Sequence, residues 1–275
     1  MPSSNPAFSR FGPDGNGRQQ PAPWATQAQP YGAPGQNGAP TQFDPYAAPS
    51  PYAATTTRYM TMDDVVTKTG VTFIVTVLAA AATWALPGTT GWGLAFPAVL
   101  VGLVLGLVIS FKAIANPVAT LAYAAIEGVF LGAISEAFEQ QFGGIVMQAV
   151  IGTFGVFAGM LVVYKTGAIR VTPKFTRWII GALVGVLVLM FANIIASFIT
   201  PGGLGLRDGG PLAIVFSLVV IGVAAFSLLL DFDMADEAIR RGAPAKFAWY
   251  IAFGLLVTVV WLYIEILRLL SYFRE

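Results

Sequence analysis

Seven long apolar segments follow one another after Arg58, separated by short stretches that contain charged residues, proline or glycine. A helix needs about 20 mostly apolar residues to cross roughly 30 Å of hydrocarbon, and each segment approaches that length. Strands of a membrane barrel would instead alternate polar and apolar residues, and the sequence has no such period. The pattern therefore predicts an all-α, polytopic membrane protein whose spans are Val71–Leu86, Trp92–Phe111, Pro117–Phe138, Ile145–Tyr164, Trp178–Thr200, Leu212–Asp233 and Phe247–Leu270.

The first 57 residues differ in composition from the rest of the chain. Eleven of the eighteen prolines lie there, among Gln, Gly, Ala, Ser and Tyr, with no apolar run long enough to be buried. Such a composition is typical of disorder, and the segment lacks the basic start and apolar core of a secretory signal. The sequence thus predicts a disordered tail over residues 1–57 and a transmembrane domain over residues 58–275.

Composition narrows the chemistry further. With 56% hydrophobic and 11% charged residues and a mean hydropathy of +0.71, the chain cannot cover a water-soluble surface. It contains no His and no Cys, which removes the usual nucleophiles, general bases and zinc ligands. Its net charge of +1, without a basic stripe, argues against a nucleic-acid partner. We therefore expect neither an enzyme nor a resident cofactor.

Lysine and arginine in the short loops predict the orientation, because these residues are enriched on the cytoplasmic side. The distribution places the N-terminus in the cytoplasm of a multi-pass plasma-membrane protein and the C-terminus outside. A re-entrant last segment would instead return the C-terminus to the inside. Ten cationic residues lie on the expected inner side and three on the outer: Arg58, Lys68, Lys112, Lys165, Arg170, Lys174, Arg177, Arg240, Arg241 and Lys246, against Arg207, Arg268 and Arg274.

Pairs of glycines four positions apart indicate how the helices pack in the lipid bilayer. Small residues let helix backbones approach closely where lipid provides no hydrophobic driving force. The same spacing serves contacts within one chain as readily as contacts between chains, and we expect a compact monomer. The pairs are Gly102/Gly106, Gly128/Gly132, Gly155/Gly159 and Gly181/Gly185.

Acidic residues inside the apolar segments are the candidates for function, because an ionisable group at membrane depth is costly unless it is paired, protonated or hydrated. Glu127, near the middle of the third segment, is either a proton or cation ligand or a hydrogen-bond partner of a neighbouring helix. Asp231 and Asp233 lie at the inner end of the sixth segment. Glu265 lies deep in the seventh, where Arg268 could pair with it only if both were buried.

Other polar positions carry weaker expectations. Glu136 lies one to two turns before the outer end of the third segment. Asp63 and Asp64 precede the first segment, and we expect them to be solvated or to lie in an amphipathic turn at the membrane surface. Asn193, in the fifth segment, is expected to be a structural hydrogen-bond partner.

Three motifs occur in order on the third, sixth and seventh segments. They are Leu121-Ala-Tyr-Ala-Ala-Ile-Glu127-Gly128-Val-Phe-Leu-Gly132, Phe226-Ser227 through Asp233, and Leu262-Tyr-Ile-Glu265. Together they resemble the Ala-Tyr…Glu-Gly…Leu-Gly signature and the two acidic motifs of the Bax inhibitor-1/YccA (transmembrane Bax-inhibitor-motif) family. The resemblance covers roughly residues 58–275 and leaves the proline-rich segment outside.

This resemblance implies six helices around a central seventh, and a calcium leak that pH controls. It also implies two acids, one from each of the last two helices, that share a proton near the cytoplasmic side. Asp233 matches the first acid, since it lies seven positions after Phe226, and Glu265 takes the place of the second. The pair would gate the leak and bind Ca²⁺ weakly, with Glu127 and Asp231 as additional candidates.

Two carboxyl groups held close in a low dielectric cannot both ionise cheaply, so they titrate as a unit; ionised, they offer oxygen ligands to Ca²⁺. A turn at Gly242-Ala243-Pro244 would nevertheless leave Asp233 and Glu265 roughly 15 Å apart in depth on ideal helices. Positions two apart on a helix point about 200° from each other, so only one of Asp231 and Asp233 can face the seventh helix. The pattern from Phe226 selects Asp233.

Two other functional classes compete with a pH-sensitive calcium leak. One is a non-conducting regulatory membrane protein, because some relatives bind a membrane-anchored protease and the tail suits contacts with a partner. The other is an intramembrane aspartyl protease, but the Gly-x-Gly-Asp pattern of those enzymes is missing around both acids.

Overall fold

Seven long helices make up almost all of the structure. The computed structural model describes residues 58–86 and 90–274, and in these ranges it contains no β-strand beyond one isolated bridge. All seven helices are long and apolar enough to cross a membrane, so the all-α, seven-span prediction is confirmed. The expected disordered tail lies outside the described residues. The helices are α1 (Met62–Trp84), α2 (Thr90–Lys112), α3 (Pro117–Gln141), α4 (Ile145–Thr166), α5 (Pro173–Ser197), α6 (Pro211–Arg240) and α7 (Ala248–Tyr272).

Helix α1 begins nine residues before the predicted start at Val71 (71 − 62 = 9), because a polar capping box extends it. The side chain of Thr61 accepts a hydrogen bond from the backbone of Asp64, whose own side chain accepts one from the backbone of Thr61. Asp64 is only 7% exposed and pairs with Arg58 at 3.1 Å and Lys68 at 3.6 Å. Of the two placements expected for Asp64, the structure therefore has not the solvated one but the polar turn that precedes the apolar part of the span.

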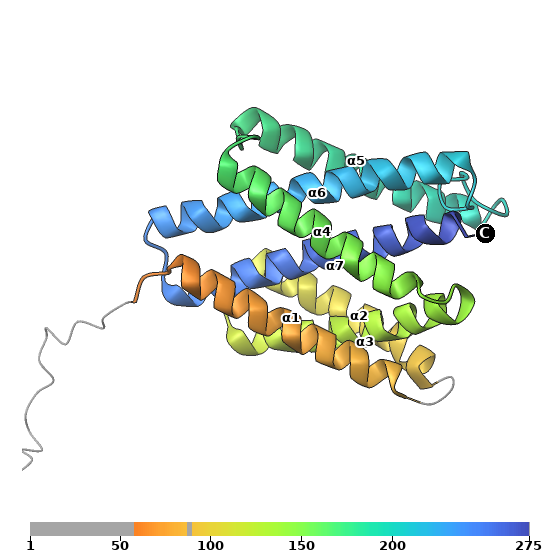
Figure 1. Cartoon of the computed structure of the whole chain (residues 1–275), viewed down its shortest axis with the longest axis horizontal. Helices are drawn as coiled ribbons and strands as arrows, with labels where there is room; N and C mark the ends of the chain where they lie inside the picture. Colours follow the sequence, from red (N-terminus) through yellow and green to blue (C-terminus); the bar gives the residue numbers. More distant parts are fainter. Residues whose placement is uncertain (1–57, 87–89, 275) are drawn as a thin grey trace, which may run out of the picture. The chain divides into compact units, whose positions relative to one another are not determined.

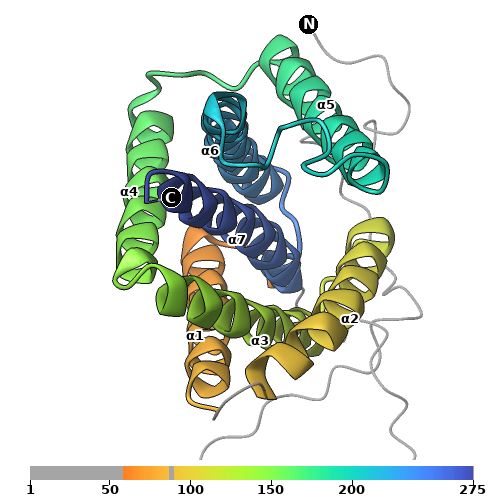
Figure 2. The ribbon, with the colours of Figure 1, turned by 90° about the vertical axis from the view of Figure 1, so that its right-hand side faces the viewer.

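Helix α7 lies at the centre of the bundle (Figure 2). Helices α1, α3, α4 and α6 pack directly on it, whereas α2 packs on α3 and α5 packs on α6. Within the most apolar stretch of each helix, 67% of α7 is buried but only 11% of α5. The central seventh helix is thus confirmed, with α2 and α5 as outer members. Because α7 is one continuous helix of 25 residues, the last segment is not re-entrant.

The glycine pairs divide into two groups. A Cβ atom at Gly128 or Gly132 of α3 would lie 2.4 Å from a backbone carbonyl oxygen of α1, so only glycine permits this close crossing. Gly102 and Gly106 of α2 face the side chains of Glu127 and Tyr123. These two pairs serve contacts within the chain. At the other two pairs, Gly155/Gly159 and Gly181/Gly185, no described atom lies within 4 Å of the added Cβ.

The start of α1 is tied to the turn between α6 and α7. The backbone of Met60 donates to the carbonyl of Ala243 at 2.8 Å, and that of Ala245 donates to the carbonyl of Arg58 at 2.8 Å. Lys68 donates to the Ala245 carbonyl and lies 5.8 Å from the centre of the Trp249 ring. The first turn of α1 therefore positions the turn from which α7 starts.

Candidate functional site

Asp231 is the acid of α6 that faces the central helix. The hydroxyl of Thr258 on α7 donates to its carboxylate at 2.6 Å. Gly254, one turn earlier on α7, also lies beside the carboxylate, since a Cβ there would be in ordinary contact with Asp231 Oδ1 at 3.9 Å. Asp231 is partly buried, and among the described residues no lysine or arginine lies within 4.0 Å of it.

Asp233 points elsewhere, so the predicted register along α6 is wrong by two residues. Its carboxylate lies 3.5 Å from the hydroxyl of Tyr164 on α4. Phe226 lies seven positions before Asp233, about two turns away on nearly the same face of α6. It packs edge-to-face against Phe175 of α5 at 5.9 Å. The face that Phe226 marks therefore belongs to the outer side of α6, and the face of Asp231 belongs to α7.

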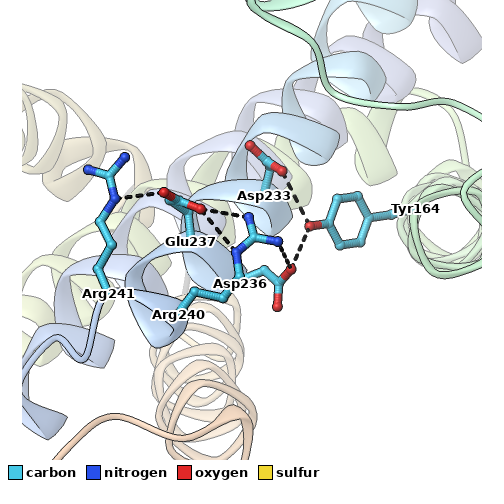
Figure 3. A network of polar contacts seen from close by, with 6 residues as sticks. All are labelled: Tyr164, Asp233, Asp236, Glu237, Arg240 and Arg241. Carbon is cyan, nitrogen blue, oxygen red and sulfur yellow. Dashed lines mark hydrogen bonds and ion pairs between the residues drawn. The ribbon is translucent and has the colours of Figure 1, made fainter. Parts of the chain in front are cut away.

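The last turns of α6 carry an acidic network that arginines partly neutralise (Figure 3). The Tyr164 hydroxyl lies 3.5 Å from both Asp233 and Asp236, although its single proton can serve only one of them at a time. Arg240 pairs with Asp236 at 3.3 Å and with Glu237 at 2.6 Å. Arg241 adds a second contact of 2.6 Å to Glu237. These are half-exposed ion pairs at the helix end.

A cavity of about 590 Å³ connects Asp231 with this helix end; we refer to it as the acidic cavity. Three carboxylates line it, and its remaining walls come from α5, α6 and the α6–α7 turn. The described residues contain no group of three or more acidic side chains arranged to hold a metal ion. Its lining includes Asp231, Asp233, Glu237, Arg241, Thr176 and Phe247.

Glu265 lies at the opposite end of α7 and has two cationic partners. It is 1% exposed, and its Oε1 atom lies 2.9 Å from Arg207 and 3.2 Å from Arg268. Arg207 precedes Pro211, where α6 begins, whereas Asp233 lies 22 residues after Pro211 (233 − 211 = 22). At about 1.5 Å per residue this places Asp233 roughly 33 Å further along α6. The structure does not bring Asp233 and Glu265 together, so the predicted carboxylate pair is not formed.

The remaining sequence candidates lie outside the lining of the acidic cavity. Glu127 hydrogen-bonds to Tyr123 on its own helix and packs against Gly102 of α2, away from the acidic cavity. Glu136 accepts from Gln140 at 3.0 Å. Asn193 accepts from the backbone of Leu204 at 2.9 Å and thereby fixes the α5–α6 loop. Asn193 is a structural partner, as expected, but of a loop rather than a helix.

Sequence reasoning missed Thr258 and Arg207. A signal for Thr258 was available: Asp231 lies 12 positions before Ala243 in the turn, and Thr258 lies 15 positions after it (243 − 231 = 12; 258 − 243 = 15). Nearly equal distances from a turn place two residues of an antiparallel helix pair at similar depth. No local signal pointed to Arg207, which lies 58 positions from Glu265 in the loop before α6.

Comparison with known proteins fits this arrangement. The family described as Bax inhibitor 1 like matches residues 5–275. The chain belongs to this family. The match starts at residue 5, so the expectation that the resemblance begins near Arg58 is wrong. An uncharacterized protein of Chlamydia muridarum (strain MoPn / Nigg) is 30% identical over 81 residues, which cover 30% of this chain and 34% of that relative. This Bax inhibitor 1 like chain thus spans about a third of the relative it matches.

Proposed function

We propose that this Bax inhibitor 1 like protein is a pH-modulated cation leak, with Ca²⁺ as the conducted ion, in which Asp231 is the gating carboxylate. The 2.6 Å hydrogen bond from Thr258 to Asp231 carries the proposal. It joins α6 to the central helix at the acidic cavity, and the described residues supply no cation to neutralise Asp231. The protonation of Asp231 therefore bears directly on the contact between these helices.

The hydrogen-bond inventory explains how one proton would act. The Thr258 hydroxyl lies 2.6 Å from Asp231 and 3.2 Å from the Gly254 carbonyl, but it has one proton to donate. When Asp231 is a neutral acid, it donates to Thr258, and Thr258 donates to Gly254, so both contacts are satisfied and α6 is held against α7. When Asp231 is ionised, Thr258 serves only one acceptor, and the carboxylate requires water or a cation.

The cavity and the loop charges support an orientation of the protein in the membrane. The connections on the α6–α7 side hold ten of the lysines and arginines after residue 57, against three on the other side, which favours a cytoplasmic α6–α7 end in the plasma membrane. The acidic cavity would then open toward the cytoplasm. Asp233 and Glu237 would attract cations to it. A site with only a small number of carboxylate ligands binds Ca²⁺ weakly, and can therefore release it.

Calcium-dye-loaded liposomes containing the purified protein test the proposal. Wild-type flux is expected to depend on pH, and Asp231→Asn is expected to remove that dependence because an amide does not titrate. Asp233→Asn, which changes a carboxylate in the same cavity, is the matched control and is expected to keep the dependence. Loss of pH dependence in Asp233→Asn alone would reassign the gate. No wild-type Ca²⁺ flux at any pH would contradict a leak and favour the non-conducting regulatory alternative.

A further inference from the structure

A second cavity shares no lining residue with the acidic cavity. It has a volume of about 270 Å³ and is enclosed by α1, α3, α4 and α7; we refer to it as the apolar cavity. In Figure 1, α7 runs behind the interval between α4 and α1. Those two helices contact each other through the edge-to-face pair of Phe73 and Phe157 at 6.3 Å, and their backbones are otherwise rarely close, which leaves the cavity a mouth beside that pair. All four helices are membrane spans, so the mouth faces hydrocarbon.

The few hydroxyl groups in the apolar cavity already have partners within the protein. Thr76 donates to the Thr72 carbonyl at 3.1 Å, and Thr153 donates to the Ala149 carbonyl at 2.7 Å. The Ser135 and Tyr263 hydroxyls hydrogen-bond to each other at 2.7 Å. A bound water needs two to four polar partners, and this lining offers it little. An unfilled void of this size would also forfeit dispersion contacts along its walls.

The exposure of the lining residues shows how an occupant would enter. Val77 of α1 and Phe154 of α4 are 59% and 48% exposed and form the rim. Leu256 and Val260 of α7 are 1% and 6% exposed and form the interior wall. Apolar side chains therefore continue from the lipid-facing surface to the central helix.

We propose that the apolar cavity binds an acyl chain of a membrane phospholipid, which reaches α7 between α1 and α4. A hydrocarbon chain fits a lining whose hydroxyls are engaged and whose mouth opens within the membrane. It is present at that mouth in every bilayer. The binding site is independent of the proposed leak, since no residue of the acidic cavity contributes to it. The acyl chain contacts the face of α7 next to the face that carries Thr258.

Photocrosslinking tests this directly. The full chain is reconstituted with a phosphatidylcholine that carries a diazirine in one acyl chain, illuminated, and digested for mass spectrometry. Adducts are expected on Leu256 and Val260, which a lipid remaining at the protein surface cannot touch, as well as on exposed positions of α5 such as Val184. Adducts on α5 without any on Leu256 or Val260 would overturn the proposal.

A variant at the rim of the apolar cavity distinguishes an acyl chain that enters the cavity from lipid that only contacts the protein surface. Val77→Trp places a larger side chain at the mouth and is expected to remove the Leu256 and Val260 adducts while those on α5 remain. Val184→Trp, at a position on α5 with similar exposure (55%), is the matched control and is expected to leave the interior adducts unchanged. Interior adducts that persist in Val77→Trp and in a second rim variant, Phe154→Trp, would overturn entry through this mouth.

A second measurement, which needs no labelled lipid, distinguishes a water-filled cavity from one filled with hydrocarbon. The chain has no cysteine, so Val260→Cys introduces a single thiol. We expect this thiol to resist a charged, water-soluble reagent in liposomes unless the protein is unfolded. Rapid reaction in the folded protein would contradict a hydrocarbon occupant.

Discussion

A carboxylate lies toward each end of the α6–α7 helix pair, and the two carboxylates have different partners. At one end Glu265 is fully buried and lies within 3.2 Å of two arginines. At the other end Asp231 is partly buried, borders a cavity and, within residues 58–86 and 90–274, has the hydroxyl of Thr258 on α7 as its side-chain hydrogen-bond partner. A buried acid with cationic partners has its charge compensated within the structure, whereas one without them has no such compensation. Burial alone therefore does not identify the functional acid.

The largest effect expected from this comparison is on stability. Glu265→Gln leaves Arg207 and Arg268 without their anion, and removing one partner of a buried ion pair costs on the order of 3–5 kcal/mol. Asp231→Asn keeps a hydrogen-bonding group of the same shape and should cost about 1 kcal/mol or less. Denaturation of both variants in the same detergent measures the difference. Equal losses would mean that the two ends are not distinct.

A double-mutant cycle sharpens this result. In the Glu265→Gln background, Arg207→Gln should cost much less than it does in the wild type, because its partner is already gone. Residues in direct contact show coupling energies of about 0.5–3 kcal/mol, and we expect the upper part of that range. Arg274→Gln is the control, since Arg274 contacts Gln148 and the α3–α4 turn and should not couple to Glu265. Additive losses for Arg207 and Glu265 would contradict the pair.

An intermediate effect is expected at Thr258. Thr258→Val retains the shape but removes the donor, and a hydrogen bond to a charged group is worth about 1.5–3 kcal/mol against about 1 kcal/mol for a neutral one. The ionised form of Asp231 therefore loses more than the neutral form, so the midpoint of the pH-dependent flux should move to higher pH without losing the dependence. Thr258→Ser, which keeps the hydroxyl, should restore the wild-type midpoint. An unchanged midpoint in Thr258→Val would mean that Thr258 takes no part in gating.

The smallest effect is expected in the half-exposed network at the end of α6. Glu237→Gln removes the partner of Arg240 and Arg241, but pairs in contact with solvent contribute little to stability. Both the melting temperature and the pH profile of flux should stay close to wild type. A loss of pH dependence here would move the titrating group from Asp231 to the helix end.

The sequence was sufficient for the fold but not for the faces of its helices. Length and hydropathy predicted seven spans, and the motifs around Glu127, Asp233 and Glu265 pointed to the family that residues 5–275 match. The register of α6 was wrong because lipid-facing and protein-facing positions are both apolar in a membrane, so periodicity does not reveal the side that meets α7. Phe226, which suggested that register, packs toward α5.

The partners of the acids were harder to predict than the acids themselves. Arg207 reaches Glu265 from a loop 58 positions earlier, and only the folded bundle brings them within 2.9 Å. Asp64 is a local case, because a capping box extends α1 and buries it. Hydropathy carries no information on a distant cation or on a capping box.

The central claim is that the protonation of Asp231, rather than that of another acid of the bundle, controls the flux. Infrared difference spectra of the reconstituted protein, recorded on either side of the flux midpoint, report a protonated carboxyl group directly through its C=O stretch. We predict a difference band that disappears in Asp231→Asn and persists in Asp233→Asn and in any folded Glu265→Gln protein. A band that survives in Asp231→Asn and vanishes in Glu265→Gln would contradict the account.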